Sequence, residues 1–94
     1  MKPENVNPGN FEVNKILFDN NEFAIAYGKF EEGQNCIAMR WNGDGEDDKG
    51  YPKTFGNPMW FIVHNDLMLL ILKGLVGKEN SKKVELLQIL ETEI

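Results

Sequence analysis

The stretch PMWFIVHNDLMLLILKGLVG, residues 58–77, decides the fold of this chain. It begins with an apolar run up to His64 that is typical of a strand, and Asn65 or Asp66 can then cap a helix. Only Lys73 and Gly74 interrupt the apolar surface of that helix. A helix that is apolar on all sides is covered on all sides, so we expect partners on more than one of its faces.

Three runs with alternating apolar residues precede this stretch, at residues 12–18, 22–30 and 35–42. Such alternation is typical of strands. If Asn20 and Asn21 form a two-residue hairpin turn, Phe18 lies opposite Phe23 and a second apolar pair follows behind it. An acidic, Gly-rich loop separates the third run from the fourth. The sequence therefore predicts an α+β fold, a four-stranded antiparallel sheet followed by an apolar α-helix.

The third run has a large apolar face, which we expect to lie beside a strip of small residues on the second run and under the helix. The opposite face would then be open. A slip of one residue in register would exchange the two faces. The large face holds Ile37, Met39 and Trp41, the small strip holds Ala24, Ala26 and Gly28, and the open face would hold Tyr27, Lys29 and Arg40.

The 94 residues are enough for one domain with a thin core. Residues 1–10, rich in Pro, Gly and Asn, are expected to form a mobile arm, and residues 11–94 one β-β-β-β-α unit. Helical spacing resumes after Ser81, which predicts a short C-terminal helix. Because one sheet cannot cover the whole apolar helix, we also expect a homodimer that forms through that helix.

The net charge of −5 opposes non-specific attraction to nucleic acid and to anionic membranes. The start of the chain lacks the apolar stretch of a signal peptide, and the longest apolar run is too short to cross a bilayer. The single Cys36 lies in an apolar run, so we expect it to be a buried thiol in a protein of a reducing compartment. We therefore expect a cytoplasmic protein without membrane contact.

No catalytic, metal-binding or cofactor-binding motif is present. The acidic loop from Asn42 to Asp48 does not match a helix-loop-helix calcium site, which requires Gly at its sixth position and Glu at its twelfth. His64 and Cys36 are each the only residue of their type, so a zinc site cannot be assembled in one chain. We expect neither an enzyme nor a cofactor.

Two segments, residues 39–43 and 49–55, interleave cations with aromatic rings. Bases of a single strand stack on such rings while cations bind the phosphates. The alternative is structural, with Trp41 in the core and Tyr51 and Phe55 packing the loop. Both interpretations stand at this point.

The order of three strands, Gly-rich loop, strand and long helix resembles the positive cofactor four type of transcriptional coactivator, and the related Whirly proteins. The likeness covers about residues 14–77 and is closest at Ile37-Ala38-Met39-Arg40. It implies a sheet face that binds single-stranded DNA or RNA and a helix that pairs with its copy. By this likeness, phosphate contacts would come from Lys29, Arg40, Lys49 and Lys53, and stacking from Tyr27, Tyr51 or Trp41.

The chain departs from this pattern in its acidic loop and in the adjacent rings of Trp60 and Phe61. Acidic groups near two lysines cancel much of the attraction that single-strand binding needs. The alternative function is a protein-interaction module that uses the apolar sheet and helix surface and the acidic loop. A neutral or negative open face would favour this alternative.

Overall fold

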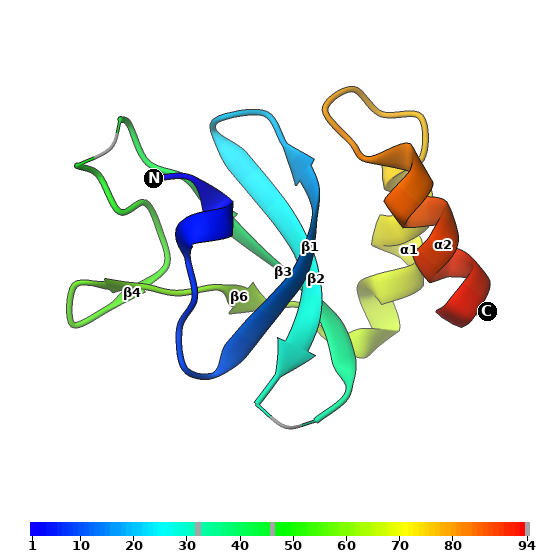
Figure 1. The fold of residues 1–94 in the computed structure, drawn as a ribbon, viewed down its shortest axis with the longest axis horizontal. Helices are drawn as coiled ribbons and strands as arrows, with labels where there is room; N and C mark the ends of the chain where they lie inside the picture. Colours follow the sequence, from blue (N-terminus) through cyan, green and yellow to red (C-terminus); the bar gives the residue numbers. More distant parts are fainter. Residues whose placement is uncertain (32, 46, 94) are drawn as a thin grey trace.

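The computed structural model describes residues 1–31, 33–45 and 47–93 and confirms the α+β fold. Four antiparallel strands form one sheet in the order β1-β2-β3-β6, and a separate hairpin pairs β4 with β5 (Figure 1). The bounds are η1 Pro3–Asn5, β1 Phe11–Asp19, β2 Phe23–Phe30, β3 Asn35–Trp41, β4 Lys53–Thr54, β5 Asn57–Pro58, β6 Phe61–Ile62, α1 Asn65–Leu75 and α2 Lys83–Glu93.

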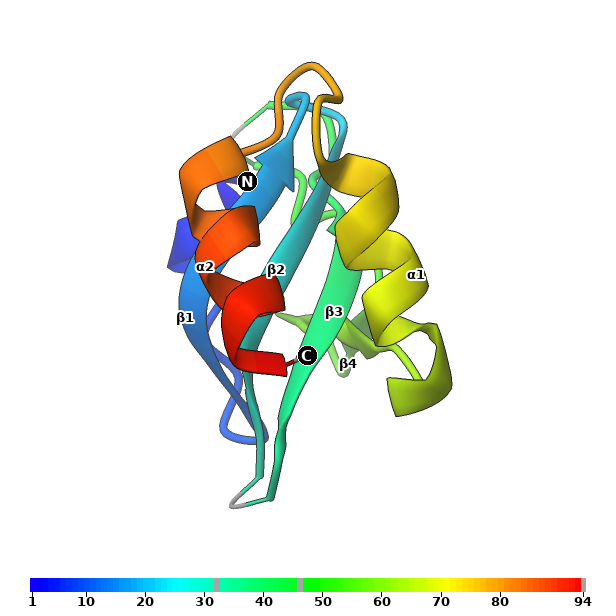
Figure 2. The ribbon, with the colours of Figure 1, turned by 90° about the vertical axis from the view of Figure 1, so that its right-hand side faces the viewer.

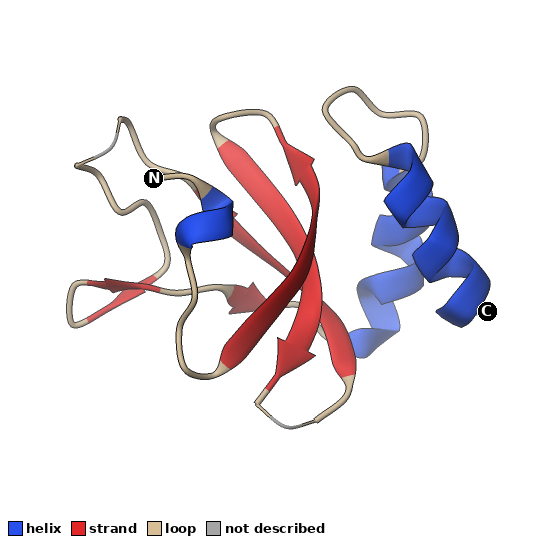
Figure 3. Cartoon of the chain, viewed as in Figure 1, coloured by secondary structure: helices blue, strands red, loops and turns tan. Residues whose placement is uncertain are grey.

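The two helices lie side by side on one face of the sheet, α1 on the side of β3 and α2 on the side of β1 (Figure 2). The strands all lie on the other side of this helix pair (Figure 3). The cap of α1 is His64, one residue before the expected cap, and its Nδ1 accepts a hydrogen bond from the backbone N–H of Asp66 at 3.1 Å. The C-terminal helix has 11 residues, as many as α1. Together the helices bury Met68, Leu72, Leu75, Leu86, Ile89 and Leu90 against the sheet.

The first hairpin turns one residue later than the sequence predicted. Asn20 pairs with Phe23 through a backbone hydrogen bond of 3.2 Å, so Asn21 and Glu22 form the turn. Asn21 has φ 74°, and the Asn20 side chain accepts hydrogen bonds from the backbone N–H groups of residues 22 and 23. Phe18 consequently lies opposite Ile25 and not opposite Phe23.

The predicted division of the sheet faces is also wrong in part. Tyr27 pairs directly with Ile37, so both lie on the face that the helices cover. The small residues of β2 pair with residues of the opposite face, and they do not lie beside the large apolar set. Position 28 requires glycine, because a Cβ there would collide with the backbone oxygen of Glu12 and would lie 2.9 Å from the ring of Phe11. The second face therefore carries its own core, made of Val6, Phe11, Ala24, Ala26, Cys36, Ala38 and Trp60.

The N-terminal segment, which we expected to be a mobile arm, lies over this second face (Figure 1). Pro3 and Val6 are buried, and the Val6 carbonyl accepts a hydrogen bond from the Trp60 indole N–H at 2.8 Å. The Met1 amino group donates to the carbonyls of Asn42 and Gly45 at 2.7 and 3.0 Å. The helices therefore cover much of one face of the sheet and this segment covers the other, so neither face is open along its whole length.

The fourth strand pairs over only two residues, Phe61 and Ile62, although its apolar run begins earlier. The residues before it form the β4–β5 hairpin, which projects from the side of the sheet opposite the helices (Figure 1). Among the described residues, no helix has both the length and the apolar character needed to cross a membrane.

Candidate functional site

Arg40 does not lie on an open surface, contrary to the expected phosphate contact. Its side chain is 1% exposed and points into the second face. The guanidinium donates from Nη1 to the Met59 carbonyl at 2.5 Å and from Nη2 to the Lys49 carbonyl. Burial lowers the pKa of Arg40 from its ordinary value. Arg40 therefore ties the two ends of the segment 49–59 to the sheet.

Tyr27 and Lys29 are also separated from the other predicted residues. Tyr27 is buried under α2, and its hydroxyl donates to Glu93 Oε1 at 2.8 Å. Burial, together with this hydrogen bond, raises the pKa of Tyr27 to about 12. Lys29 is exposed, but six residues along β2 from Phe23, a separation of ~20 Å at the rise of a strand. Neither residue can share a ligand site with the aromatic segment at the other end of the sheet.

Trp41 and Tyr51, in contrast, are brought together at that end. They form an isolated antiparallel bridge with backbone hydrogen bonds of 2.8 and 3.0 Å, so their side chains point to the same side. Phe23 pairs with Trp41 from the other flank, with ring centroids 4.8 Å apart in an edge-to-face arrangement. Trp41 is 50% and Tyr51 65% exposed. The three rings form a row across neighbouring strands.

A second rank of side chains continues this row along the strands. Phe61 lies opposite Met39, which is two residues before Trp41 on the same face, and Phe61 is 62% exposed. The helices cover the half of this face around Ile37 and leave the end with Trp41 uncovered. We call this end the aromatic surface; it consists of the exposed residues Trp41, Tyr51 and Phe61 together with Phe23 and Met39, which are partly buried against the core under the helices.

The outer side of α1 carries further exposed apolar side chains on the same side of the sheet. Leu67, Leu70 and Ile71 share one side of the helix by their spacing, and Leu67 and Leu70 are exposed. Gly74 follows on this side, and a Cβ built on it would meet nothing within 4 Å. The packing within one chain therefore does not explain a glycine at this helical position, which costs ~1 kcal/mol relative to Ala.

The segments that adjoin the aromatic surface in sequence carry charges of both signs, and the Met1 amino group donates to the Asp48 carbonyl at 3.3 Å. Glu22 adjoins Phe23, and the loop after Trp41 contains exposed Asp44, Asp47 and Asp48. Hydrogen bonds from the backbone N–H groups of Asp44 and Gly50 lower the pKa of Asp48, which keeps it ionised. Lys49 and Lys53 are exposed on the same segment, and the Lys49 ammonium donates to the Gly56 carbonyl at 2.8 Å. This balance does not favour a polyanion.

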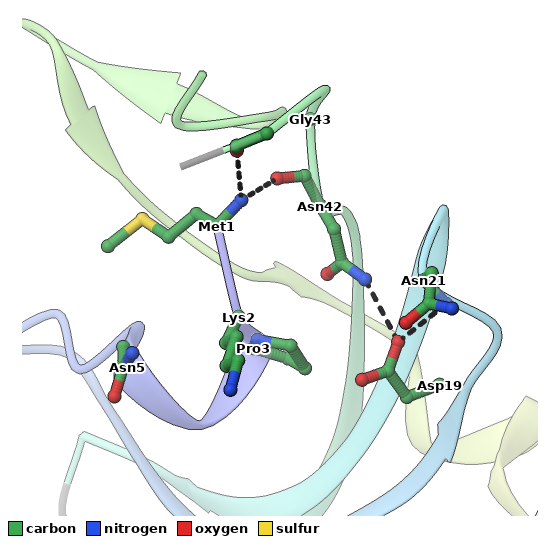
Figure 4. A pocket seen from close by; sticks show the side chains of 9 residues that line it. Met1, Lys2, Pro3, Asn5, Asp19, Asn21, Asn42 and Gly43 are labelled. Atoms are coloured by element: carbon green, nitrogen blue, oxygen red, sulfur yellow. Dashed lines mark hydrogen bonds between the residues drawn. The ribbon is translucent and has the colours of Figure 1, made fainter. Parts of the chain in front are cut away.

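A polar pocket of about 540 Å³ lies on the opposite side, between the N-terminal segment and the ends of β1 and β3 (Figure 4). Asp19 Oδ1 accepts hydrogen bonds from the backbone N–H of Asn21 at 2.9 Å and from Asn42 Nδ2 at 3.0 Å. On the side of the loop after β3, the Met1 amino group closes the pocket by donating hydrogen bonds to the carbonyls of Asn42 and Gly45. Its polar groups thus bond mainly to one another, and the pocket holds the N-terminal segment in place.

Within residues 1–31, 33–45 and 47–93 no cluster of three or more His, Cys, Asp or Glu side chains could hold a metal ion. Comparison with models of protein families, with curated proteins and with solved structures returned no match. The candidate site therefore rests on the geometry of this chain alone.

Sequence reasoning found two members of the aromatic surface, Trp41 and Tyr51, and missed three. The neighbouring ring of Trp60 was the available signal for Phe61. Adjacent residues of a strand point to opposite faces, so the two rings cannot both be buried in the same core. Trp60 is 4% exposed, and Phe61 is the ring left outside. Phe23 and Met39 carried no separate signal, since they also fit an ordinary core.

Proposed function

We propose that this chain is a non-catalytic protein-interaction module that docks a partner through the aromatic surface. The observation that carries the proposal is the joint exposure of Trp41, Tyr51 and Phe61 on one uncovered end of the sheet. Aromatic side chains present about 150–250 Å² each. Roughly 60% of three such side chains is ~360 Å², a patch of the size that is often functional in a monomer.

Burying this patch would contribute ~9 kcal/mol at 25 cal/mol per Å² before the costs of association. Aromatic rings and Met are also the residue types that are enriched at the centres of interfaces, where they supply most of the binding energy. The backbone bridge between Trp41 and Tyr51 supports the proposal further, because it fixes the two positions from which their rings project.

Charge and burial favour this function over single-strand binding. Stacking on Trp41 and Tyr51 is compatible with nucleic acid, but Arg40 is buried and Lys29 lies at the far end of β2. Only Lys49 and Lys53 of the four expected phosphate contacts lie on the segment that carries Tyr51. The loop aspartates oppose even these two.

Panning a random peptide library tests the docking function. Native protein and the double variant Trp41→Ala/Phe61→Ala are immobilised, with Phe55→Ala as the matched control, since Phe55 is a fully exposed ring at the tip of the β4–β5 hairpin. We expect peptides that bind the native protein and the control but not the double variant. Peptides that bind all three equally, or no enrichment at all, would contradict the proposal.

Fluorescence anisotropy of a labelled ~20-nucleotide single strand tests the competing function. We expect no binding even at low salt. Binding that prefers the single strand to its duplex and weakens steeply with salt would instead support the coactivator-like interpretation. Unfolding curves of every variant check that lost binding does not reflect lost folding.

We also propose that the chain forms a homodimer through the outer side of α1. Support comes from exposed Leu67 and Leu70 beside Gly74, where a second helix could approach closely. Leu70→Asp should then yield monomers in sedimentation at micromolar concentration, and native protein that sediments only as a monomer would reject the dimer. Buried Cys36, a thiol without a disulfide, supports a location in a reducing compartment such as the cytoplasm.

A further inference from the structure

The tip of the β4–β5 hairpin carries a phenylalanine in a backbone conformation that does not suit it. Thr54 pairs with Asn57, so Phe55 and Gly56 form the turn, with φ 51° and 78°. A two-residue turn with two positive φ angles favours Asn, Asp or Gly at its first position. A bulky side chain is strained in this conformation. The local rules of the hairpin therefore do not explain a phenylalanine at this position.

Packing does not compensate for the strain either, because the Phe55 side chain is 100% exposed. The hairpin projects from the side of the sheet opposite the helices (Figure 1). Two hydrogen bonds brace it below the ring. The Lys49 ammonium donates to the Gly56 carbonyl at 2.8 Å, and the Met59 N–H donates to the Pro52 carbonyl at 2.9 Å. A strained, exposed ring on a braced turn is typical of a residue that serves binding.

A pocket that could take such a ring lies elsewhere on the same chain, where the end of β2 approaches β6. It has a volume of about 630 Å³. Phe30, Cys36, Ile62 and Val63 supply its apolar lining, and polar residues that include Glu31 supply the rest. An apolar cavity of ~150 Å³ already takes up benzene, so one phenylalanine ring fits. The chain thus carries both an unburied ring and a pocket for a ring.

The charges around the ring and the pocket are complementary. Lys49 and Lys53 are the only charged residues between positions 49 and 59, although Asp48 is close enough for its charge to interact with Lys53. At the pocket, Glu31 is exposed. Opposite charges at the rim of a contact favour its formation and set its orientation.

We propose that the hairpin of one copy inserts Phe55 into this pocket of a second copy of the chain. The ring and the pocket belong to different parts of the fold, so the contact is head-to-tail. One phenylalanine presents ~200 Å², whereas a standard interface buries ~800 Å² per partner. We therefore expect a dissociation constant on the order of 1 mM. Sedimentation at micromolar concentration does not detect so weak a contact, and it reports the α1 dimer separately.

Nuclear magnetic resonance of a mixture tests the proposal. Isotope-labelled Phe55→Ala protein keeps the pocket and lacks the ring. It is mixed at ~0.1 mM with unlabelled protein at up to ~1 mM, either native or Phe55→Ala. Both unlabelled proteins keep α1 and the aromatic surface, so contacts through these surfaces are the same in the two mixtures. Only the native protein adds the ring.

We expect the backbone amide signals of Cys36, Ile62 and Val63 to shift progressively with native protein and to stay in place with the Phe55→Ala variant. No shift of these signals, or equal shifts in the two mixtures, would overturn the proposal. Peptide docking that needs Trp41 and Phe61 is unaffected by either result, so the two proposals fail separately.

A stability measurement checks the premise that Phe55 does not serve the fold. Asn tolerates a positive φ, so the Phe55→Asn variant should unfold at a higher urea concentration than the native protein. A lower midpoint would show that the ring stabilises the hairpin, and the argument for a binding role would then fall.

Discussion

Replacing Arg40 with Met should strongly lower the free energy of unfolding. It should not change the affinity for nucleic acid. The substitution keeps a long apolar stem and removes the guanidinium that bonds to the Lys49 and Met59 carbonyls. An exposed phosphate contact would behave in the opposite way, because surface substitutions usually change stability by less than ~0.5 kcal/mol. The variant therefore separates the buried arginine of the structure from the ligand-binding arginine that the sequence predicted.

The size of the effect follows from the groups left behind. Each of the two carbonyls would lose a charged donor, and an unsatisfied buried acceptor costs ~1–3 kcal/mol. Relief of the buried charge offsets part of this cost. We expect a loss of about 3 kcal/mol, which is a large share of the ~5–15 kcal/mol that stabilises a domain.

Urea unfolding followed by Trp fluorescence measures this loss. With a slope of roughly 1–3 kcal/mol per M, the midpoint of the Arg40→Met variant should fall by ~1–3 M. The Arg40→Lys variant keeps the charge but cannot bond to both carbonyls. Its urea midpoint should lie between that of Arg40→Met and that of the native protein. Lys29→Met is the matched control, since Lys29 is an exposed cation on the neighbouring strand. A midpoint for Arg40→Met equal to that of Lys29→Met would refute the buried arrangement.

Three further predictions concern other parts of the fold. The pKa of Tyr27 in the folded protein is about 12, above the ordinary value of 10.0. The stability that Tyr27 contributes is therefore complete below pH 10 and is lost as pH rises toward 12. At pH 11 the native protein should have lost ~1.4 kcal/mol that the Tyr27→Phe variant does not lose, as measured by urea unfolding at both pH values. Gly28→Ala should lower thermal stability by ~3 kcal/mol or prevent folding, because its methyl group meets the Glu12 backbone, whereas Gly9→Ala should not. Trp60→Phe should cost ~1–2 kcal/mol in the same unfolding assay, since the Val6 carbonyl loses its donor.

The sequence predicted the order of the elements because alternation in the strands and the apolar helix are strong, local patterns. It did not predict the register, because register depends on details without a sequence signature. The pairing of β1 with β2 shifts between Val13 and Lys15 and again between Ile16 and Phe18. The later turn moves Phe18 opposite Ile25, and each shift then moves the residues farther from the turn relative to their partners, so Ile16 lies opposite Ala26.

The second core was missed for a different reason. Ala24, Ala26 and Gly28 were read as the small complement of a helix, but they make room for Phe11 and Trp60 on the opposite face. The segment that covers them is rich in Pro, Gly and Asn, which normally indicates a loop. Buried Pro3 and Val6, the hydrogen bond from Trp60 to the Val6 carbonyl and the bonds of the Met1 amino group together fix this segment.

The burial of Arg40 links the fold to the aromatic surface. Its guanidinium bonds to the carbonyls of Lys49 and Met59, which flank the segment that carries Tyr51 and leads into Phe61. The backbone bridge between Trp41 and Tyr51 holds the same segment beside the sheet. Arg40, the one arginine of the chain, is 1% exposed and holds the two ends of this segment by hydrogen bonds to their carbonyls. It follows that Arg40→Lys, if still folded, should weaken docking at the aromatic surface although Arg40 itself touches no partner.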